Sequence, residues 1–201
     1  MVIQDVHLPD IQYFLLAYPI CLSLIGAVFI ATHLGFQAPK YLFWMGLACI
    51  FPSIGLAAQT LMSNAQLRLT APWLALFYLG GAWAVAHGML LKANSKSNIF
   101  VASTLIVVGM GSLLYFTHVD EQLWPRIVTI NIMILCLEAL ALPKIYVLFK
   151  KTYALEMLLC ASYFLLFAYG VLRTSIVIIY FQNVQNVALA TTTWWMTMIA
   201  V

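Results

Sequence analysis

Two ionisable side chains, Glu138 and Arg173, lie inside long apolar runs of this 201-residue chain. An ionised group at membrane depth costs much free energy, so such residues usually face a cavity or a partner. Counted from the ends of their runs that we assign below to the outer side, Glu138 lies about 17 Å deep and Arg173 about 12 Å deep, at about 1.5 Å per residue. An arginine side chain spans that difference. The first hypothesis is therefore a buried ion pair between Glu138 and Arg173 that holds two helices together.

The second hypothesis is a ligand pocket open to the outer side. Arg173 shares the outer half of its region with Asn131, Thr174 and Tyr169. A guanidinium among such neighbours is suited to an anionic or polar ligand, because it offers several hydrogen-bond donors and a fixed positive charge. A third reading is that Glu138 or Arg173 extends toward a membrane surface. Glu156 is set apart, since it lies at the inner end of its helix, where lipid headgroups or Lys151 are within its range.

Other chemistry finds little support in the residue pattern. His33 and His87 fall near the inner ends of their helices, yet without Cys, Asp or Glu at ligand spacing they predict packing histidines and no metal site. The sequence contains no HExxH motif, no phosphate-cradling glycine loop and no Gly-x-Ser-x-Gly, each of which would indicate a known catalytic mechanism. We therefore expect no catalytic residue and no cofactor in this chain.

The elements that position these side chains are membrane helices. Of the residues, 65% are hydrophobic and only 7% are charged, and about 20 apolar residues suffice to cross a bilayer. A further apolar run, 190–201, would rise only about 18 Å, short of the roughly 30 Å needed. The sequence predicts an all-α, polytopic membrane helix bundle of six complete helices plus a truncated seventh, with the six over 11–33, 41–62, 72–92, 99–117, 127–142 and 154–181.

The distribution of basic residues predicts the orientation, since lysine and arginine are retained on the cytoplasmic side. The second and fourth loops hold only Arg68 and Arg126, whereas the first, third and fifth hold Lys40, Lys92, Lys96, Lys144, Lys150 and Lys151. We expect the N-terminus outside, residues 1–201 as one domain, and a cytoplasmic output domain after residue 201. The net charge of +3 is explained by lysines beside anionic lipid, so membrane lipid is an expected partner and nucleic acid is not.

Small residues and a proline predict how the helices meet. Gly80, Ala84 and Gly88 recur every four residues of the third predicted helix, a spacing that lets two backbones approach closely in lipid. We expect that helix to lie centrally. Pro52 in the second helix removes one backbone hydrogen bond and favours a kink.

Three stretches of the chain resemble the seven-helix N-terminal membrane region of some bacterial diguanylate cyclases of the GGDEF family. They are ATHLGFQAPKYLFWMGLA at 31–48, YFTHVDEQLWPR at 115–126 and YGVLR at 169–173. The resemblance implies a sensory domain in the bacterial inner membrane. It would control a cytoplasmic domain that makes cyclic di-GMP from GTP with Mg²⁺, and the whole protein would act as a homodimer. The GGDEF signature itself is absent from the 201 residues.

Two other classes of function stay open. A small proton-coupled transporter would use Glu138 and the kink at Pro52, although the inverted repeats expected of transporters are not visible. A membrane scaffold subunit would need no ligand at all. In the sensory reading the ligand is a small anionic or polar molecule that arrives from the periplasmic side.

Overall fold

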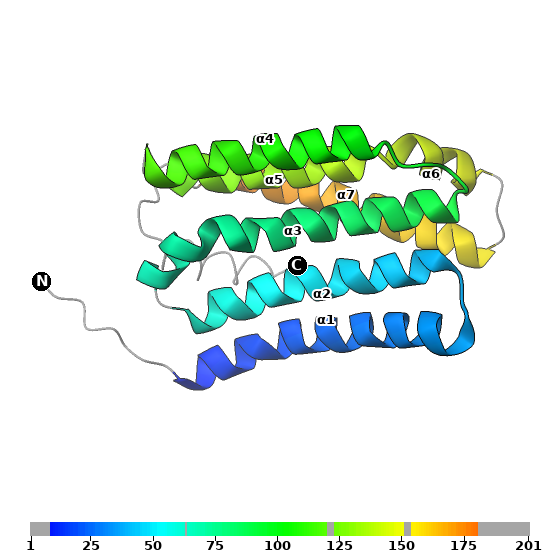
Figure 1. Cartoon of the computed structure of the whole chain (residues 1–201), viewed down its shortest axis with the longest axis horizontal. Helices are drawn as coiled ribbons and strands as arrows, with labels where there is room; N and C mark the ends of the chain where they lie inside the picture. The colour runs from blue at the N-terminus through cyan, green and yellow to red at the C-terminus, as the bar shows by residue number, and fades with distance from the viewer. Residues whose placement is uncertain (1–8, 63, 120–122, 151–153, 181–201) are drawn as a thin grey trace, which may run out of the picture.

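The computed structural model describes residues 9–62, 64–119, 123–150 and 154–180 (Figure 1). Within these residues the chain forms helices and no strand, so the all-α prediction is confirmed. The helices are α1 (Pro9–Phe36), α2 (Lys40–Leu61), α3 (Asn64–Lys92), α4 (Ile99–His118), α5 (Leu123–Ala139), α6 (Leu142–Phe149) and α7 (Ala154–Tyr180).

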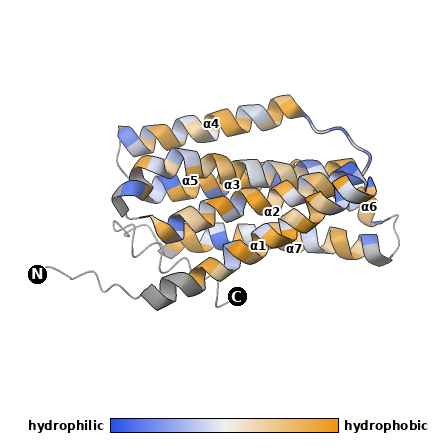
Figure 2. Cartoon of the chain, turned by 60° about the horizontal axis from the view of Figure 1, so that its bottom comes forward, coloured by the Kyte–Doolittle hydropathy of each residue, from blue (hydrophilic) through white to orange (hydrophobic). Residues whose placement is uncertain are grey.

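The bundle has the dimensions and surface of a membrane protein. Five of the described helices are long and apolar enough to cross a bilayer, and α5 with α6 makes a sixth span if this pair, bent by 44°, counts as one. Hydrophobic residues predominate along the helices (Figure 2), and many of them are exposed, as with Leu24, Val107 and Leu165, which are 62%, 69% and 73% exposed. In water such a surface would promote aggregation, whereas in lipid it is the expected exterior. The predicted run 190–201 lies outside the described residues.

Several helix boundaries differ from the prediction, and two of the differences involve a proline. The predicted helix 127–142 ends at Ala139, because Pro143 has no N–H to donate to the Ala139 carbonyl. Pro143 instead lies in the first turn of α6, where a proline fits, in a segment predicted to be a loop. Conversely, α3 begins at Asn64 and runs through Pro72, so this proline does not mark the start of the helix as predicted.

The prediction that the third helix is central is confirmed. Helix α3 packs against α2, α4, α5 and α6, and Ala84 on it is fully buried. A Cβ atom at Gly88 would lie 3.3 Å from Trp44 Cβ, and one at Gly80 would lie 3.1 Å from Phe51 Cδ2. The small residues therefore admit the larger side chains of α2.

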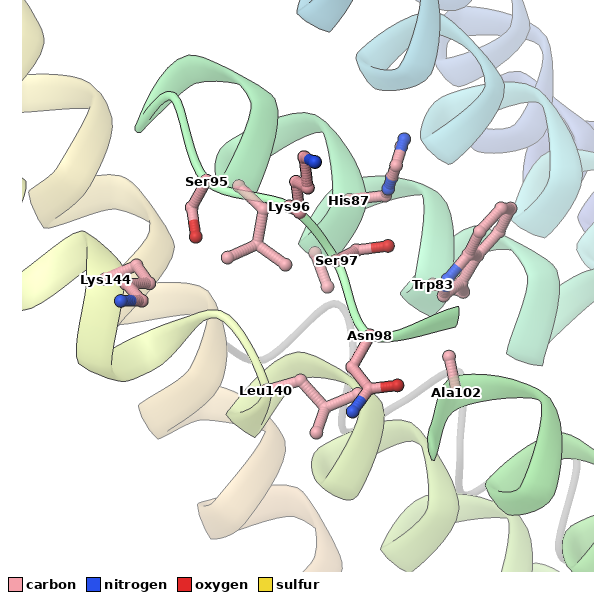
Figure 3. Close-up of a pocket in the computed structure, with 11 residues that line it drawn as sticks. Trp83, His87, Ser95, Lys96, Ser97, Asn98, Ala102, Leu140 and Lys144 are labelled. Carbon is pink, nitrogen blue, oxygen red and sulfur yellow. The ribbon is translucent and has the colours of Figure 1, made fainter. Parts of the chain in front are cut away.

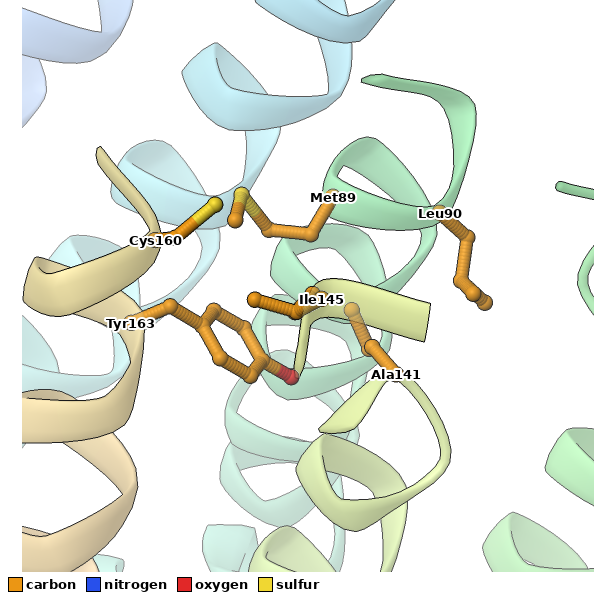
Figure 4. Packing of buried hydrophobic residues seen from close by; sticks show 7 residues of the cluster. Met89, Leu90, Ala141, Ile145, Cys160 and Tyr163 are labelled. Carbon is orange, nitrogen blue, oxygen red and sulfur yellow. The ribbon is translucent and has the colours of Figure 1, made fainter. Parts of the chain in front are cut away.

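One end of the bundle gathers the lysines of the described residues. The α1–α2 connection, the α3–α4 connection and α6 all lie at this end (right in Figure 1), and they include or adjoin Lys40, Lys96, Lys144 and Lys150. Beneath them Met89, Ile145, Cys160 and Tyr163 form a buried cluster that joins α3, α6 and α7 (Figure 4). We call the end of the bundle that carries these lysines the basic end.

Glu156 pairs with a residue that the sequence did not suggest. Its Oε1 lies 2.5 Å from Lys92 Nζ, so the contact joins α7 to α3 at the basic end. The same ammonium group lies 5.1 Å from the centre of the Tyr41 ring on α2. Lys92 therefore holds three helices together, and Lys151, the partner considered from sequence, lies outside the described residues.

Candidate functional site inside the bundle

Glu138 lies one residue before the end of α5, next to the bend into α6. It is only 7% exposed. Its backbone carbonyl accepts a hydrogen bond from the Tyr163 hydroxyl at 2.6 Å, and its carboxylate points at α7, since Oε2 lies 3.8 Å from where a Cβ at Gly170 would be. The absence of a side chain at Gly170 therefore lets this carboxylate lie against α7.

Arg173 lies on the same face of α7, three residues after Gly170. Side chains on an α-helix lean toward its N-terminus, so Arg173 leans back toward Gly170 and Glu138. It lies close enough to Tyr169, Tyr78, Glu138 and Tyr18 to interact with each electrostatically. Arg173 therefore lies within electrostatic range of Glu138, its partner in the ion-pair hypothesis, and of Tyr169, a member of the predicted ligand pocket.

Two tyrosines of this site were missed from the sequence. Tyr18 comes from α1 and Tyr78 from α3, and both interact with Arg173. A tyrosine in an apolar run gives no signal of its own, because its ring packs like any other aromatic ring. We call Tyr18, Tyr78, Glu138, Tyr169 and Arg173 the arginine cluster.

The members of the arginine cluster differ in burial. The Tyr78 hydroxyl is buried beside Gly55 of α2 and has no hydrogen-bond partner among the described residues. Tyr18 is 52% exposed, and Arg173 is half-buried. A buried hydroxyl without a partner is costly, so the cluster offers a hydrogen-bonding group that a polar ligand would satisfy.

Asn131 and Thr174 are held by their own helices. Asn131 Nδ2 donates to the Ile127 carbonyl at 2.8 Å, and Thr174 Oγ1 donates to the Gly170 carbonyl at 2.8 Å. Both side chains are buried, each 6% exposed. Each keeps further hydrogen-bonding capacity, because an amide has a second N–H and a carbonyl oxygen, and a hydroxyl oxygen also accepts.

The histidines pack against other residues. His33 Nδ1 lies 2.5 Å from the Ala38 carbonyl oxygen, and the His87 ring packs against both Trp44 and Trp83, with centroids 4.5 Å and 5.2 Å away. Among the residues that the structure describes, no three His, Cys, Asp or Glu side chains converge on a point where a metal ion would bind.

Comparison with known proteins adds no assignment to this geometry. No family model, curated protein or solved structure matches the chain.

Proposed function

We propose that this chain is a membrane-embedded sensory domain that controls a C-terminal cytoplasmic output domain, a diguanylate cyclase. The arginine cluster is the observation that supports it. One guanidinium interacts with groups on α1, α3 and α5 as well as with Tyr169 on its own helix, α7. Any change at Arg173 therefore acts on the position of α7 relative to three other helices.

The cluster gives a physical route from ligand to output. A ligand shifts a conformational equilibrium by the difference between its affinities for the two states. An anionic or polar molecule bound to Arg173 would compete with Glu138 for the guanidinium. Because Glu138 is on α5 and Arg173 on α7, this competition would weaken the interaction between the two helices. The interaction between α5 and α7 would therefore be weaker in the ligand-bound state than in the free state. The resulting change in the position of α7 would alter the activity of the output domain.

The remaining assignments belong to the same proposal. The protein resides in the bacterial inner membrane with its basic end in the cytoplasm, and the ligand arrives from the periplasm. The output domain binds GTP and Mg²⁺ and acts in a homodimer, since two half-sites must meet to form cyclic di-GMP.

The test uses the natural full-length protein with Arg173→Gln, Arg173→Lys and the control Arg126→Gln. Arg126 contacts Thr117 at 3.5 Å and is no member of the arginine cluster, so its replacement controls for the loss of an arginine. Cyclic di-GMP is measured in cells that receive a panel of small organic anions, together with the yield of folded protein. We expect Arg173→Gln to fold and to lose the anion response, Arg173→Lys to keep part of it, and Arg126→Gln to respond like wild type.

Two outcomes would count against the proposal. If cyclic di-GMP were the same in every variant and under every anion, the sensory role would be wrong. If both Arg173 variants yielded no folded protein, the Glu138–Arg173 pair would be a structural lock, and a membrane scaffold without a ligand would be favoured.

The burial of Glu138 supports a second candidate, a proton-coupled transporter. A carboxyl that is only 7% exposed within a membrane span is a group that proton-coupled transporters use. Uptake of labelled substrates into proteoliposomes under a pH gradient would test it. Glu138→Gln should abolish uptake, and Glu156→Gln, at the edge of the bundle, should not.

A further inference from the structure

A cavity lies at the basic end, and no member of the arginine cluster lines it. It has a volume of about 130 Å³ and opens between α3, the α3–α4 connection, and the bend from α5 into α6 (Figure 3). Its polar lining residues are Trp83 and His87 of α3, Lys144 of α6, and Ser95, Lys96, Ser97 and Asn98 of the connection. None of the eleven residues described as lining it is acidic.

The charge of this cavity is positive on two sides. Lys96 comes from the α3–α4 connection and Lys144 from α6, so segments far apart in the sequence each contribute an exposed lysine to the lining of one cavity. Helix α4 begins at Ile99, directly after the lining residues, and Asn98 caps it by accepting the Val101 N–H at 3.4 Å. A helix N-terminus adds a partial positive charge. With no acidic residue to balance them, these charges favour an anion in the cavity.

Two hydrogen-bonding groups of the lining lack partners. Trp83 Nε1 and His87 Nδ1 are buried and make no hydrogen bond within the described residues. An indole N–H can only donate, and a buried donor without an acceptor is unfavourable. An acceptor-rich group in the cavity would relieve that cost.

We propose that this cavity binds a phosphate group. Lysine binds phosphate as a point charge, the serines and Asn98 supply further donors, and phosphate oxygens are acceptors for the buried indole N–H of Trp83. A molecule of liquid water occupies about 30 Å³, so about 130 Å³ accommodates a group of phosphate size. The source is either a free phosphate ester or the headgroup of an anionic lipid. This site is independent of the arginine cluster and of any output domain.

Phosphate in the cavity would also fix the bend between α5 and α6. Lys144 lies in the first turn of α6, and Leu140, which also lines the cavity, lies in the bend. A ligand held by Lys96 and Lys144 together would tie α6 to the α3–α4 connection. The orientation of α6 would then depend on occupancy of the site.

The test compares Lys96→Gln/Lys144→Gln with the control Lys40→Gln/Lys150→Gln in the purified chain. Lys40 and Lys150 are exposed at the same end and do not line the cavity, so the control removes equal charge from the same surface. Binding of inorganic phosphate is titrated in phosphatidylcholine nanodiscs, and lipid binding is measured by native mass spectrometry with phosphatidylglycerol. In the wild-type protein, acetylation of individual lysines is followed with and without each probe.

We expect saturable binding that falls on the order of tenfold in the cavity variant and stays unchanged in the control. The same probe should protect Lys96 and Lys144 from acetylation, but not Lys40. Binding of phosphate would assign a soluble ester, and binding of phosphatidylglycerol alone would assign a lipid headgroup. The proposal would be overturned if neither probe bound, if both double variants lost binding equally, or if Lys40 were protected as strongly as Lys96. The acetylation experiment uses the wild-type protein, so it tests the proposed phosphate site even if the cavity variant does not fold.

Discussion

The hydroxyl of Tyr163 stabilises the junction of α5 and α7 at the bend. It donates to the Glu138 carbonyl, which also accepts the Ala141 N–H at 3.1 Å. Tyr163→Phe removes one of two bonds to that oxygen, so we expect a loss of about 1 kcal/mol in the free energy of unfolding. Reversible unfolding in mixed micelles measures it, with Tyr146→Phe as control, because Tyr146 is 53% exposed. Equal effects of the two substitutions would contradict this role of the hydroxyl.

At the residue scale, the sequence predicts charged groups better than neutral ones. Glu138 and Arg173 stand out because a charge is expensive at membrane depth, and the structure places both in one cluster. Tyr18 and Tyr78 give no such signal, since a phenol is compatible with lipid, core or cavity. Which tyrosines face Arg173 depends on the packing of α1 and α3, and no single residue specifies that packing.

Glycine contacts hold α1 against α2. A Cβ at Gly46 would lie 2.7 Å from the Gly26 carbonyl oxygen and 2.5 Å from Ile30 Cγ1, so Gly46→Ala must push the helices apart. Overpacking of this kind costs about 1–3 kcal/mol. Gly111 on α4 is the matched control, because a Cβ there meets nothing within 4 Å. Unfolding in detergent should show a clear loss for Gly46→Ala and almost none for Gly111→Ala. A Gly46→Ala protein as stable as wild type would show that the helices separate without cost.

At the element scale, apolar length predicts spans but not their interruptions. The sequence places six helices correctly, within a few residues at most ends. It misses α6 because Pro143 and Lys144 are typical of a loop. In the sequence, a proline in the first turn of a helix cannot be distinguished from a proline that follows the end of a helix. The two cases differ in whether the Ala139 carbonyl accepts a hydrogen bond within the helix, which the sequence does not show. The cavity beside the bend is invisible for the same reason: the sequence shows Lys96 and Lys144 as markers of orientation only.

The whole molecule presents two chemically different ends. The basic end has Lys40, Lys96, Lys144 and Lys150, and the pairing of Lys92 with Glu156 ties α3 to α7 there. The orientation predicted from the sequence would put this end in the cytoplasm, where anionic lipid headgroups attract juxtamembrane lysines at about 1 kcal/mol each. The opposite end, with Val119 after α4, should then face the periplasm.

Cysteine labelling tests this orientation directly. In a background in which Cys21, Cys49, Cys136 and Cys160 are replaced, single Lys150→Cys and Val119→Cys substitutions are treated with a membrane-impermeant maleimide. Both positions are exposed, Val119 at 70%, so reactivity reports the compartment. In intact spheroplasts Val119→Cys should label and Lys150→Cys should not, whereas after lysis both should label. Labelling of Lys150→Cys from outside would invert the bundle. The basic cavity would then face the periplasm, and Arg173 could no longer receive a periplasmic ligand from the side that the sensory proposal requires.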